Sequence, residues 1–325
     1  MKNIHVTALG NALVDIEYLV SDDELQSTGL RKGGMTLASS GEQAGLLVQL
    51  AGKEGMMSSG GSAANSLIAL ANFGGRGAYK SLLGNDAHGS YYAAEFGELG
   101  LELYAERTDE LPTGTCVVLI TPDGERTMQT SLGVNVRFSN QHIDADAIAR
   151  AEWLYIEGYK FTEENGASAI DEAIFYAKKH DTNIAVTFSD TFIVHGFRDV
   201  LTRAAKNAHL IFSNEFEAKA YGETDSLDDA LHALRSDIPN VVVTLGDKGS
   251  MLHIGGRDYI IKPHATTVVN TNGAGDMFAG AFLYGLTHSM NPEQAGNLAS
   301  LASSRVVQQH GARLRENHKK LLEIV

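Results

Sequence analysis

Short apolar segments typical of β-strands alternate with longer amphipathic segments typical of helices along most of this 325-residue chain. The strand-like segments are mostly continuous apolar runs, which favours strands covered on both faces. The pattern therefore predicts an α/β fold: a doubly wound, mostly parallel sheet with helices on both faces. We expect strands at 4–9, 77–83, 153–157, 183–188, 209–212 and 240–245, with helices between them at 62–73, 91–99, 164–179, 197–207 and 226–234.

Two stretches, 15–37 and 101–132, break this alternation with short alternating segments and turn residues. Within the second stretch, Thr121–Glu125 (Thr-Pro-Asp-Gly-Glu) is a hairpin signal. We interpret the two stretches as a small β-rich lid inserted into a single domain that spans 1–325. Ordinary edge hairpins are the alternative.

Composition restricts the partners and the location of the protein. The chain has 26 Lys and Arg against 40 Asp and Glu, a net charge of −14, which argues against a nucleic acid or an anionic membrane as partner. Cys116 is the only cysteine, so no internal disulfide forms and a reducing compartment fits. We see neither an apolar run long enough to span a membrane nor a signal peptide, and we expect a cytoplasmic protein.

The Gly-rich segment Asn270–Asp276 (Asn-Thr-Asn-Gly-Ala-Gly-Asp) joins an expected strand at 266–269 to an expected helix at 274–286. Such a turn aims several backbone N–H groups at one point, at the positive end of the helix dipole, and this suits an anion. Asp276 falls in the first helical turn. There a carboxylate can take a proton from an attacking hydroxyl while the N–H groups stabilise charge, which suggests phosphoryl transfer to an alcohol. A capped turn whose glycines relieve strain is the alternative.

Rival motifs fail on spacing. A dinucleotide fingerprint needs glycine where Phe278 stands, and the Gly-Lys-Ser/Thr of a P-loop occurs nowhere in the chain. A nucleophile elbow at 60–64 lacks its last glycine, because Ala64 occupies that place. The twelve histidines show no metal-ligand spacing.

Two further polar segments suit an alcohol-bearing ligand. Gly60–Asn65 opens an apolar helix; its small residues let a ligand approach the backbone, and the amide of Asn65 can both donate and accept, as a sugar diol requires. Helix capping by Ser62 is the alternative. Asp15 follows the first strand and would accept hydrogen bonds from a pair of hydroxyls, unless it only closes a turn.

Two segments nearer the C-terminus suit a nucleotide. Asn214 follows a strand and can cap the next helix, whereas Glu217 would face the same sheet edge and hold Mg²⁺ through water. The glycines of Thr244–Gly249 let the backbone approach a phosphate or a ribose, and a hairpin turn at the same place is compatible with that role.

In their order and spacing over nearly the whole chain, these motifs resemble the ribokinase-like (PfkB) carbohydrate kinase family. Gly60–Asn65 is similar to the family's Gly-Gly-x-x-x-Asn, and Asn270–Asp276 to its Asp-Thr-x-Gly-Ala-Gly-Asp except at the first place. Asn214 and Glu217 match its Asn-x-x-Glu. The segment Gly84–Gly89 is similar to its Gly-x-Asp-x-x-Gly, and the family's nucleotide loop matches Thr244, Gly246 and Gly249.

The resemblance implies a kinase that uses ATP with Mg²⁺, often as a homodimer, here possible through the lid. It implies Asp276 as the catalytic base, with an anion hole formed by Gly273, Ala274 and Gly275. We assign the acceptor to Asn11, Asp15, Gly34, Gly61, Asn65 and, from its strand end, Glu157. We assign the nucleotide to Asn214, Thr244, Gly246 and Gly249, and Mg²⁺, through water, to Glu217.

Within the family, Gly10–Asp15, Lys32–Leu37 and Gly124–Met128 look most like bacterial adenosine-kinase-type members, in which a nucleoside 5′-hydroxyl is the acceptor. Asn270 stands where the family has an aspartate that in some members helps to hold a monovalent cation, so the resemblance leaves K⁺ activation open. Ser131 stands where similar members often have tyrosine.

The leading hypothesis is therefore an ATP-dependent kinase for a primary hydroxyl of an adenosine-like ribonucleoside or a sugar. The alternatives are a sugar kinase for fructose- or ribose-type substrates, a catalytically silent metabolite-binding protein on the same fold, and a nicotinamide dehydrogenase, which Phe278 disfavours.

Overall fold

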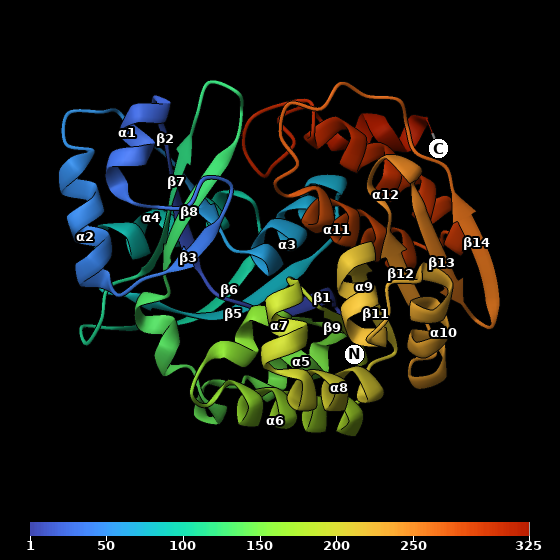
Figure 1. Cartoon of the computed structure of the whole chain (residues 1–325). Helices are drawn as coiled ribbons and strands as arrows, with labels where there is room; N and C mark the ends of the chain where they lie inside the picture. Colours follow the sequence, from blue (N-terminus) through green and yellow to red (C-terminus); the bar gives the residue numbers. More distant parts are fainter. Residues whose placement is uncertain (325) are drawn as a thin grey trace.

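The computed structural model describes residues 1–324 and contains two β-sheets (Figure 1). The larger sheet has nine strands, which lie in the order β14-β13-β12-β11-β10-β9-β1-β5-β6. In that order the strands are Arg257–Ile261, Ser250–Ile254, Val241–Thr244, Leu210–Asn214, Asn183–Thr187, Ala151–Glu157, Ile4–Leu9, Gly77–Gly84 and Glu102–Thr108. All neighbours from β12 to β6 pair in parallel, whereas β13 and β14 form an antiparallel hairpin at one edge.

Helices cover both faces of this sheet, because parallel strands need crossover connections. One face carries α3 (Ser62–Phe73), α4 (Ala87–Glu98), α11 (Ala274–Thr287) and α12 (Pro292–Val306). The other face carries α5 (Ala145–Arg150), α6 (Gly166–Lys179), α7 (Thr191–Gly196), α8 (Arg198–Asn207), α9 (Glu215–Gly222) and α10 (Leu227–Asp237). The predicted doubly wound α/β fold is confirmed.

Side chains alternate between the two cores along each central strand, as the two-residue period of a strand requires. On β9, Tyr155 packs into the core under α3 and α11, whereas Leu154 and Ile156 pack into the core under α6 and α8. Both faces of the strand are therefore apolar. This explains why the sequence shows continuous apolar runs instead of alternation.

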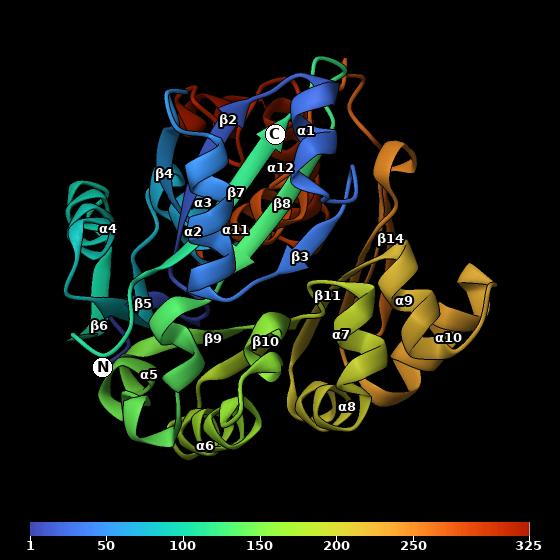
Figure 2. The ribbon, with the colours of Figure 1, turned by 60° about the vertical axis from the view of Figure 1, so that its left-hand side comes forward.

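The smaller sheet has five strands in the order β3-β8-β7-β2-β4 and stands beside the large one (Figure 2). Two short helices, α1 (Asp22–Thr28) and α2 (Ser40–Gln49), accompany it. The hairpin predicted at Thr121–Glu125 is confirmed, since Thr121 N donates to Glu125 O across the turn at 3.0 Å. The strands, in spatial order, are Met35–Leu37, Arg126–Ser131, Gly114–Ile120, Leu13–Leu19 and Met56–Gly60.

The bounds expected for this small sheet need correction. Residues 102–108 belong to the large sheet as edge strand β6, which pairs in parallel with β5. Residues 56–60 belong to the small sheet as β4, outside the expected stretches. The strand expected at 266–269 is absent: Val269 N donates to Val307 O at 2.7 Å, but no second strand lies there to extend the pairing.

Helices α3 and α11 touch at a glycine. A Cβ atom built on Gly280 of α11 would lie 2.2 Å from the carbonyl oxygen of Ser66 and 2.7 Å from Cβ of Ala69, both on α3. Only glycine admits this close approach, which brings the N-terminal ends of the two helices to the same place. Within residues 1–324, no helix has the length and apolar character needed to cross a bilayer.

We predict that Gly280→Ala destabilises the fold although alanine is the better helix former. The new methyl group collides with the backbone of α3, so the free energy of unfolding should fall by about 1–3 kcal/mol. Gly45→Ala in α2 is the matched control, because a Cβ there meets nothing within 4 Å. It should gain about 0.5–1 kcal/mol. Denaturant unfolding measures the free energy of unfolding of both variants. If both gain the same amount of stability, helices α3 and α11 do not approach each other as closely as described.

Candidate active site

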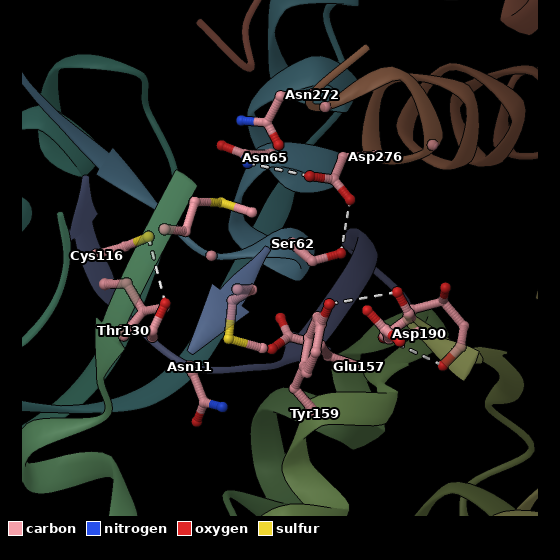
Figure 3. A pocket seen from close by; sticks show the side chains of 18 of the residues that line it. Asn11, Ser62, Asn65, Cys116, Thr130, Glu157, Tyr159, Asp190, Asn272 and Asp276 are labelled. Atoms are coloured by element: carbon pink, nitrogen blue, oxygen red, sulfur yellow. Dashed lines mark hydrogen bonds between the residues drawn. The ribbon is translucent and has the colours of Figure 1, made fainter. Parts of the chain in front are cut away.

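A cavity of about 370 Å³ lies between the two sheets, beyond the carboxyl ends of the central parallel strands (Figure 3). This is where ligands of open α/β sheets gather. Eleven of the residues assigned from sequence line it: Asn11, Asp15, Gly61, Asn65, Glu157, Asn214, Glu217, Thr244, Gly273, Gly275 and Asp276. The motifs, spread over 266 positions of the chain, therefore meet in one place.

Four assigned residues do not line the cavity: Gly34, Gly246, Gly249 and Ala274. Gly34 precedes β3, where its carbonyl accepts from Met128 N at 2.9 Å and fixes the edge of the small sheet. Gly249 has φ +91°, and a Cβ on it would lie 2.1 Å from Ile261 O, so it is required by the β12–β13 turn. Gly246, at φ +62°, belongs to the same turn. The contacts of Gly34, Gly246 and Gly249 therefore account for them as parts of the backbone that shape the sheets and the turn.

Asp276 lies in the first turn of α11 and is held by two side chains of α3. Ser62 Oγ donates to its Oδ1 at 2.6 Å, and Asn65 Nδ2 donates to its Oδ2 at 3.1 Å. Burial raises the pKa of Asp276 to about 6, and the bonds from Ser62 and Asn65 oppose that rise. The carboxylate is thus fixed in direction, faces the cavity, and titrates close to neutrality, as a proton acceptor requires.

The N–H donors expected from the sequence lie in the turn before Asp276 and in the first turn of α11. Gly273 has φ +73°, and a Cβ on it would lie 2.2 Å from Ala312 O, so only glycine fits. The N–H of Ala274 is shared with Thr271 O at 3.3 Å. Those of Gly275 and Asp276 lie in the first helical turn, where N–H groups lack an intrahelical partner. These two are the donors best placed for an anion.

Asp15 lies within β2, not in a turn, and the small sheet carries its carboxylate into the cavity. A Cβ on Gly60, its neighbour on β4, would lie 2.4 Å from Asp15 Oδ2, so glycine there leaves room for the carboxylate. Burial raises the pKa of Asp15 to about 7, and the charges of Arg313 and Arg126 oppose the rise.

Glu157 and Asn11 form the floor of the cavity and are each 1% exposed. Glu157 Oε2 accepts from the N–H of Ala63 at 2.8 Å, so it holds the start of α3 as well as facing the cavity. Asn11 Oδ1 accepts from Lys160 Nζ at 3.3 Å, and Lys160 is paired with Glu163 at 2.6 Å in the same buried layer. Burial raises the pKa of Glu157 to about 7.

Asn214 and Glu217 cap α9 reciprocally at the far end of the cavity. Glu217 N donates to Asn214 Oδ1 at 2.9 Å, and Glu217 Oε2 accepts from Asn214 N at 3.0 Å. The capping role expected as an alternative for Asn214 is therefore present, and both side chains still line the cavity. Burial raises the pKa of Glu217 to about 7.

The wall formed by the small sheet is apolar and rich in sulfur. Burial raises the pKa of the Cys116 thiol to about 12, so the thiol is neutral and serves as an apolar surface beside Thr130 (Figure 3). Such a wall suits a flat apolar ring better than a polyhydroxy chain. It comprises Leu13, Met35, Leu37, Cys116, Val118, Met128 and Leu132.

Sequence reasoning missed three residues. Ser62 was considered only as a helix cap. In the structure Gly61 is the N-cap of α3, and the Ser62 hydroxyl donates a hydrogen bond to Asp276. Arg126 on β8 pairs with the buried Glu17, and Asn272 accepts from its guanidinium in the amide orientation that the surroundings favour. Arg313 donates to Asn65 Oδ1. A serine at the start of a Gly-Gly helix was a usable signal, and Arg126 lies in the segment Gly124–Met128 that carries part of the resemblance. Arg313 belongs to no local motif.

Comparison with known proteins identifies relatives along nearly the whole chain. The profile of the pfkB family carbohydrate kinases matches residues 46–319. An adenosine kinase of Saccharomyces cerevisiae is 29% identical over 327 residues, covering 94% of this chain and 95% of the relative. The crystal structure of adenosine kinase from Sinorhizobium meliloti superposes with a TM-score of 0.91 at 32% identity, over 99% of each chain. The crystal structure of a probable sugar kinase from Rhizobium etli superposes with a TM-score of 0.93 at 31% identity, over 100% of this chain and 99% of that one.

We predict that Glu157→Gln stabilises the protein at pH 8 and not at pH 5. The folded-state pKa of Glu157 is about 7, above its ordinary value of 4.5, so the folded state binds the proton more tightly than the unfolded state. The contribution of Glu157 to stability is then fully present below pH 4.5 and is lost as the pH rises through about 7. Glutamine does not titrate, and should gain about 2–3 kcal/mol at pH 8.

The measurement is denaturant unfolding at both pH values. Glu152→Gln on the same strand, which is partly exposed, is the control and should follow the wild type at each pH. A Glu157→Gln effect of the same size at pH 5 and pH 8 would show that burial does not disfavour the charge.

Proposed function

Because the chain belongs to the pfkB family of carbohydrate kinases, and so is a phosphotransferase acting on a hydroxyl of a nucleoside or sugar, we propose that its acceptor is a ribonucleoside with a free primary hydroxyl. The donor in this proposal is the γ-phosphoryl group of ATP. The observation that carries the proposal is the carboxylate of Asp276, fixed by Ser62 and Asn65 beside the Gly-rich turn and facing a cavity with one apolar wall.

The apolar wall favours a nucleoside over a simple sugar. A base would lie against Cys116, Val118 and Met128, while its ribose would meet the polar groups of Asp15 and Asn65. Ribose or fructose would leave that wall without a partner. The yeast and Sinorhizobium relatives are named adenosine kinases, which supports the same choice.

In the proposed reaction Asp276 acts as general base. Its carboxylate takes the proton of the acceptor's primary hydroxyl, the oxygen forms a bond to the γ-phosphorus, and the bond from that phosphorus to the β–γ bridging oxygen breaks. The electron pair leaves with ADP. The N–H groups of Gly275 and Asp276 stabilise the negative charge on the transferring group, the role proposed for the turn as an anion hole.

The nucleotide would occupy the end of the cavity near Asn214, Thr244 and Glu217. Within residues 1–324 no cluster of three or more His, Cys, Asp or Glu side chains forms a metal cage. The single carboxylate of Glu217 fits an Mg²⁺ held mainly by phosphate oxygens and water, and its raised pKa would return toward normal beside a cation. Bound Mg²⁺ would neutralise phosphate charge.

K⁺ activation is not part of the proposal. Asn270 is 6% exposed, its Oδ1 accepts from Asn272 N at 2.9 Å, and it carries no negative charge to hold a cation. Its Nδ2, a buried donor with no partner within residues 1–324, is unsuited to a cation as well.

The small sheet would act as the lid that excludes water from the transferred phosphoryl group. Its edge strand β4 exposes Met56 and Met57, and these apolar side chains support the expected homodimer through the lid. A cytoplasmic location, supported by the single reduced cysteine, also remains a prediction.

We predict that Asp276→Asn lowers kcat by roughly 10²- to 10⁴-fold, because the amide cannot take a proton. Acceptor affinity, measured by calorimetry, should change little since asparagine keeps the shape of the side chain. Asp146→Asn is the control: Asp146 also lies in the first turn of a helix, α5, but is exposed. Near-normal kcat in Asp276→Asn would exclude the role of general base.

We further predict that nucleosides stabilise the protein against heat and that ribose and fructose do not. A ligand at 100 times its Kd contributes about 2.7 kcal/mol, which a thermal-shift assay detects. Each compound is tested with and without a non-hydrolysable ATP analogue, and ADP release is followed in parallel with ATP. Stabilisation by ketoses alone would favour the sugar kinase. Stabilisation by nucleosides without ADP release would indicate a silent metabolite-binding protein.

A further inference from the structure

Arg313 lies in the irregular segment between α12 and the C-terminus, more than 200 residues from the groups it binds. Its Nη1 pairs with Glu95 Oε1 at 2.7 Å, and its Nη2 donates to Ser59 Oγ at 2.8 Å. Ser59 is itself tied to Glu95 Oε2 through both its N–H, at 2.7 Å, and its hydroxyl, at 2.5 Å. The guanidinium is therefore held on two sides in a planar, charge-assisted arrangement.

The third donor of Arg313 reaches the side chain that holds Asp276. Arg313 Nε donates to Asn65 Oδ1 at 3.4 Å, and Asn65 Nδ2 donates to Asp276 Oδ2 at 3.1 Å. An amide offers its oxygen and its nitrogen on opposite sides, so occupation of the oxygen by a cation decides which group faces the carboxylate. A flipped amide would turn its oxygen toward Asp276 and repel it.

We propose that Arg313 is a positioning residue for the general base: by occupying the amide oxygen of Asn65 it commits the amide nitrogen to Asp276. This inference rests on the proposed function, and it assigns to the C-terminal segment a part in setting the protonation of Asp276. Ala312, the preceding residue, contacts the turn at Gly273, so the same segment supports the anion-binding turn and the base.

The other charged groups around Asp276 do not replace this arrangement. Asp15 on β2 and Glu157 on β9 face it as like charges, and the phenol of Tyr159 lies nearby. The pKa of Asp276 is raised by burial and lowered by the bonds from Ser62 and Asn65. Arg313 thus acts on Asp276 through Asn65, whereas its charge acts directly on Asp15 by lowering the pKa of that carboxyl.

Two substitutions separate these effects. Lysine keeps the charge near Glu95 and Asp15, but it has a methylene where arginine carries Nε, so the bond to Asn65 is lost. Arg313→Lys should therefore raise the pKa of Asp276 by about one unit, and it should raise acceptor KM less than Arg313→Met does, because Asp15 keeps its opposing charge. Arg313→Met should raise that pKa equally and also raise KM, because Asp15 loses its opposing charge.

The kinetic test is the acid limb of kcat against pH. In both variants the limb should move to higher pH by about one unit, which costs about tenfold in kcat well below the limb. Arg315→Met is the matched control, being two residues away and exposed. An unmoved limb in Arg313→Lys, with normal folding, would overturn the proposal.

A second readout does not depend on activity. The carboxyl of Asp276 is titrated by ¹³C NMR in ¹³C-Asp-labelled protein, with Asp276→Asn giving the assignment. In the Asn65→Ala background, Arg313→Lys should produce no further rise in the pKa of Asp276. An undiminished rise would overturn the proposal, because Arg313 would then act without Asn65. If the wild type phosphorylates no acceptor, the proposed function fails, and the titration still decides the role of Arg313.

Discussion

The site depends on the contact between helices α3 and α11, which glycine at 280 makes possible. Because the two helices pack backbone against backbone at that point, their first turns meet, and the side chains of Ser62 and Asn65 reach Asp276. A wider spacing would still allow the sheet to form, but it would remove the two bonds that fix the carboxylate. The direction of the Asp276 carboxylate is therefore set by packing about one helical turn away from it.

The second constraint is the burial of several carboxyl groups in the same cavity. Asp15, Glu157, Glu217 and Asp276 line it together, and burial raises the pKa of each of them. Four acids near neutrality in one cavity lower the stability of the empty protein at alkaline pH. They also let a proton or a cation enter at little cost, which is what transfer of a highly charged phosphoryl group requires.

Much of the fold follows from local sequence, and the exceptions have physical causes. Apolar runs such as Ile4–Leu9 and the turn at Thr121–Glu125 predicted their elements because one segment decides each outcome. Residues 102–108 resembled part of the lid because this edge strand is partly exposed along its whole length and has no continuous apolar run. Only its pairing with β5 assigns it to the large sheet. Residues 266–269 have strand-forming side chains but no partner strand. Arg313 could not be found from sequence, because only the folded chain brings together the three side chains that it contacts.

The separation of the site along the chain has a consequence for the order of biosynthesis. The bonds that orient Asp276 join residues 214 and 211 positions apart. A ribosome therefore exposes Asn65 and the rest of α3 long before the segment that supplies the carboxylate emerges. Both sheets also pair strands that are distant in sequence, such as β2 with β7, and such pairings form slowly. The carboxylate of Asp276 therefore cannot take up its orientation until the last quarter of the chain has packed against α3.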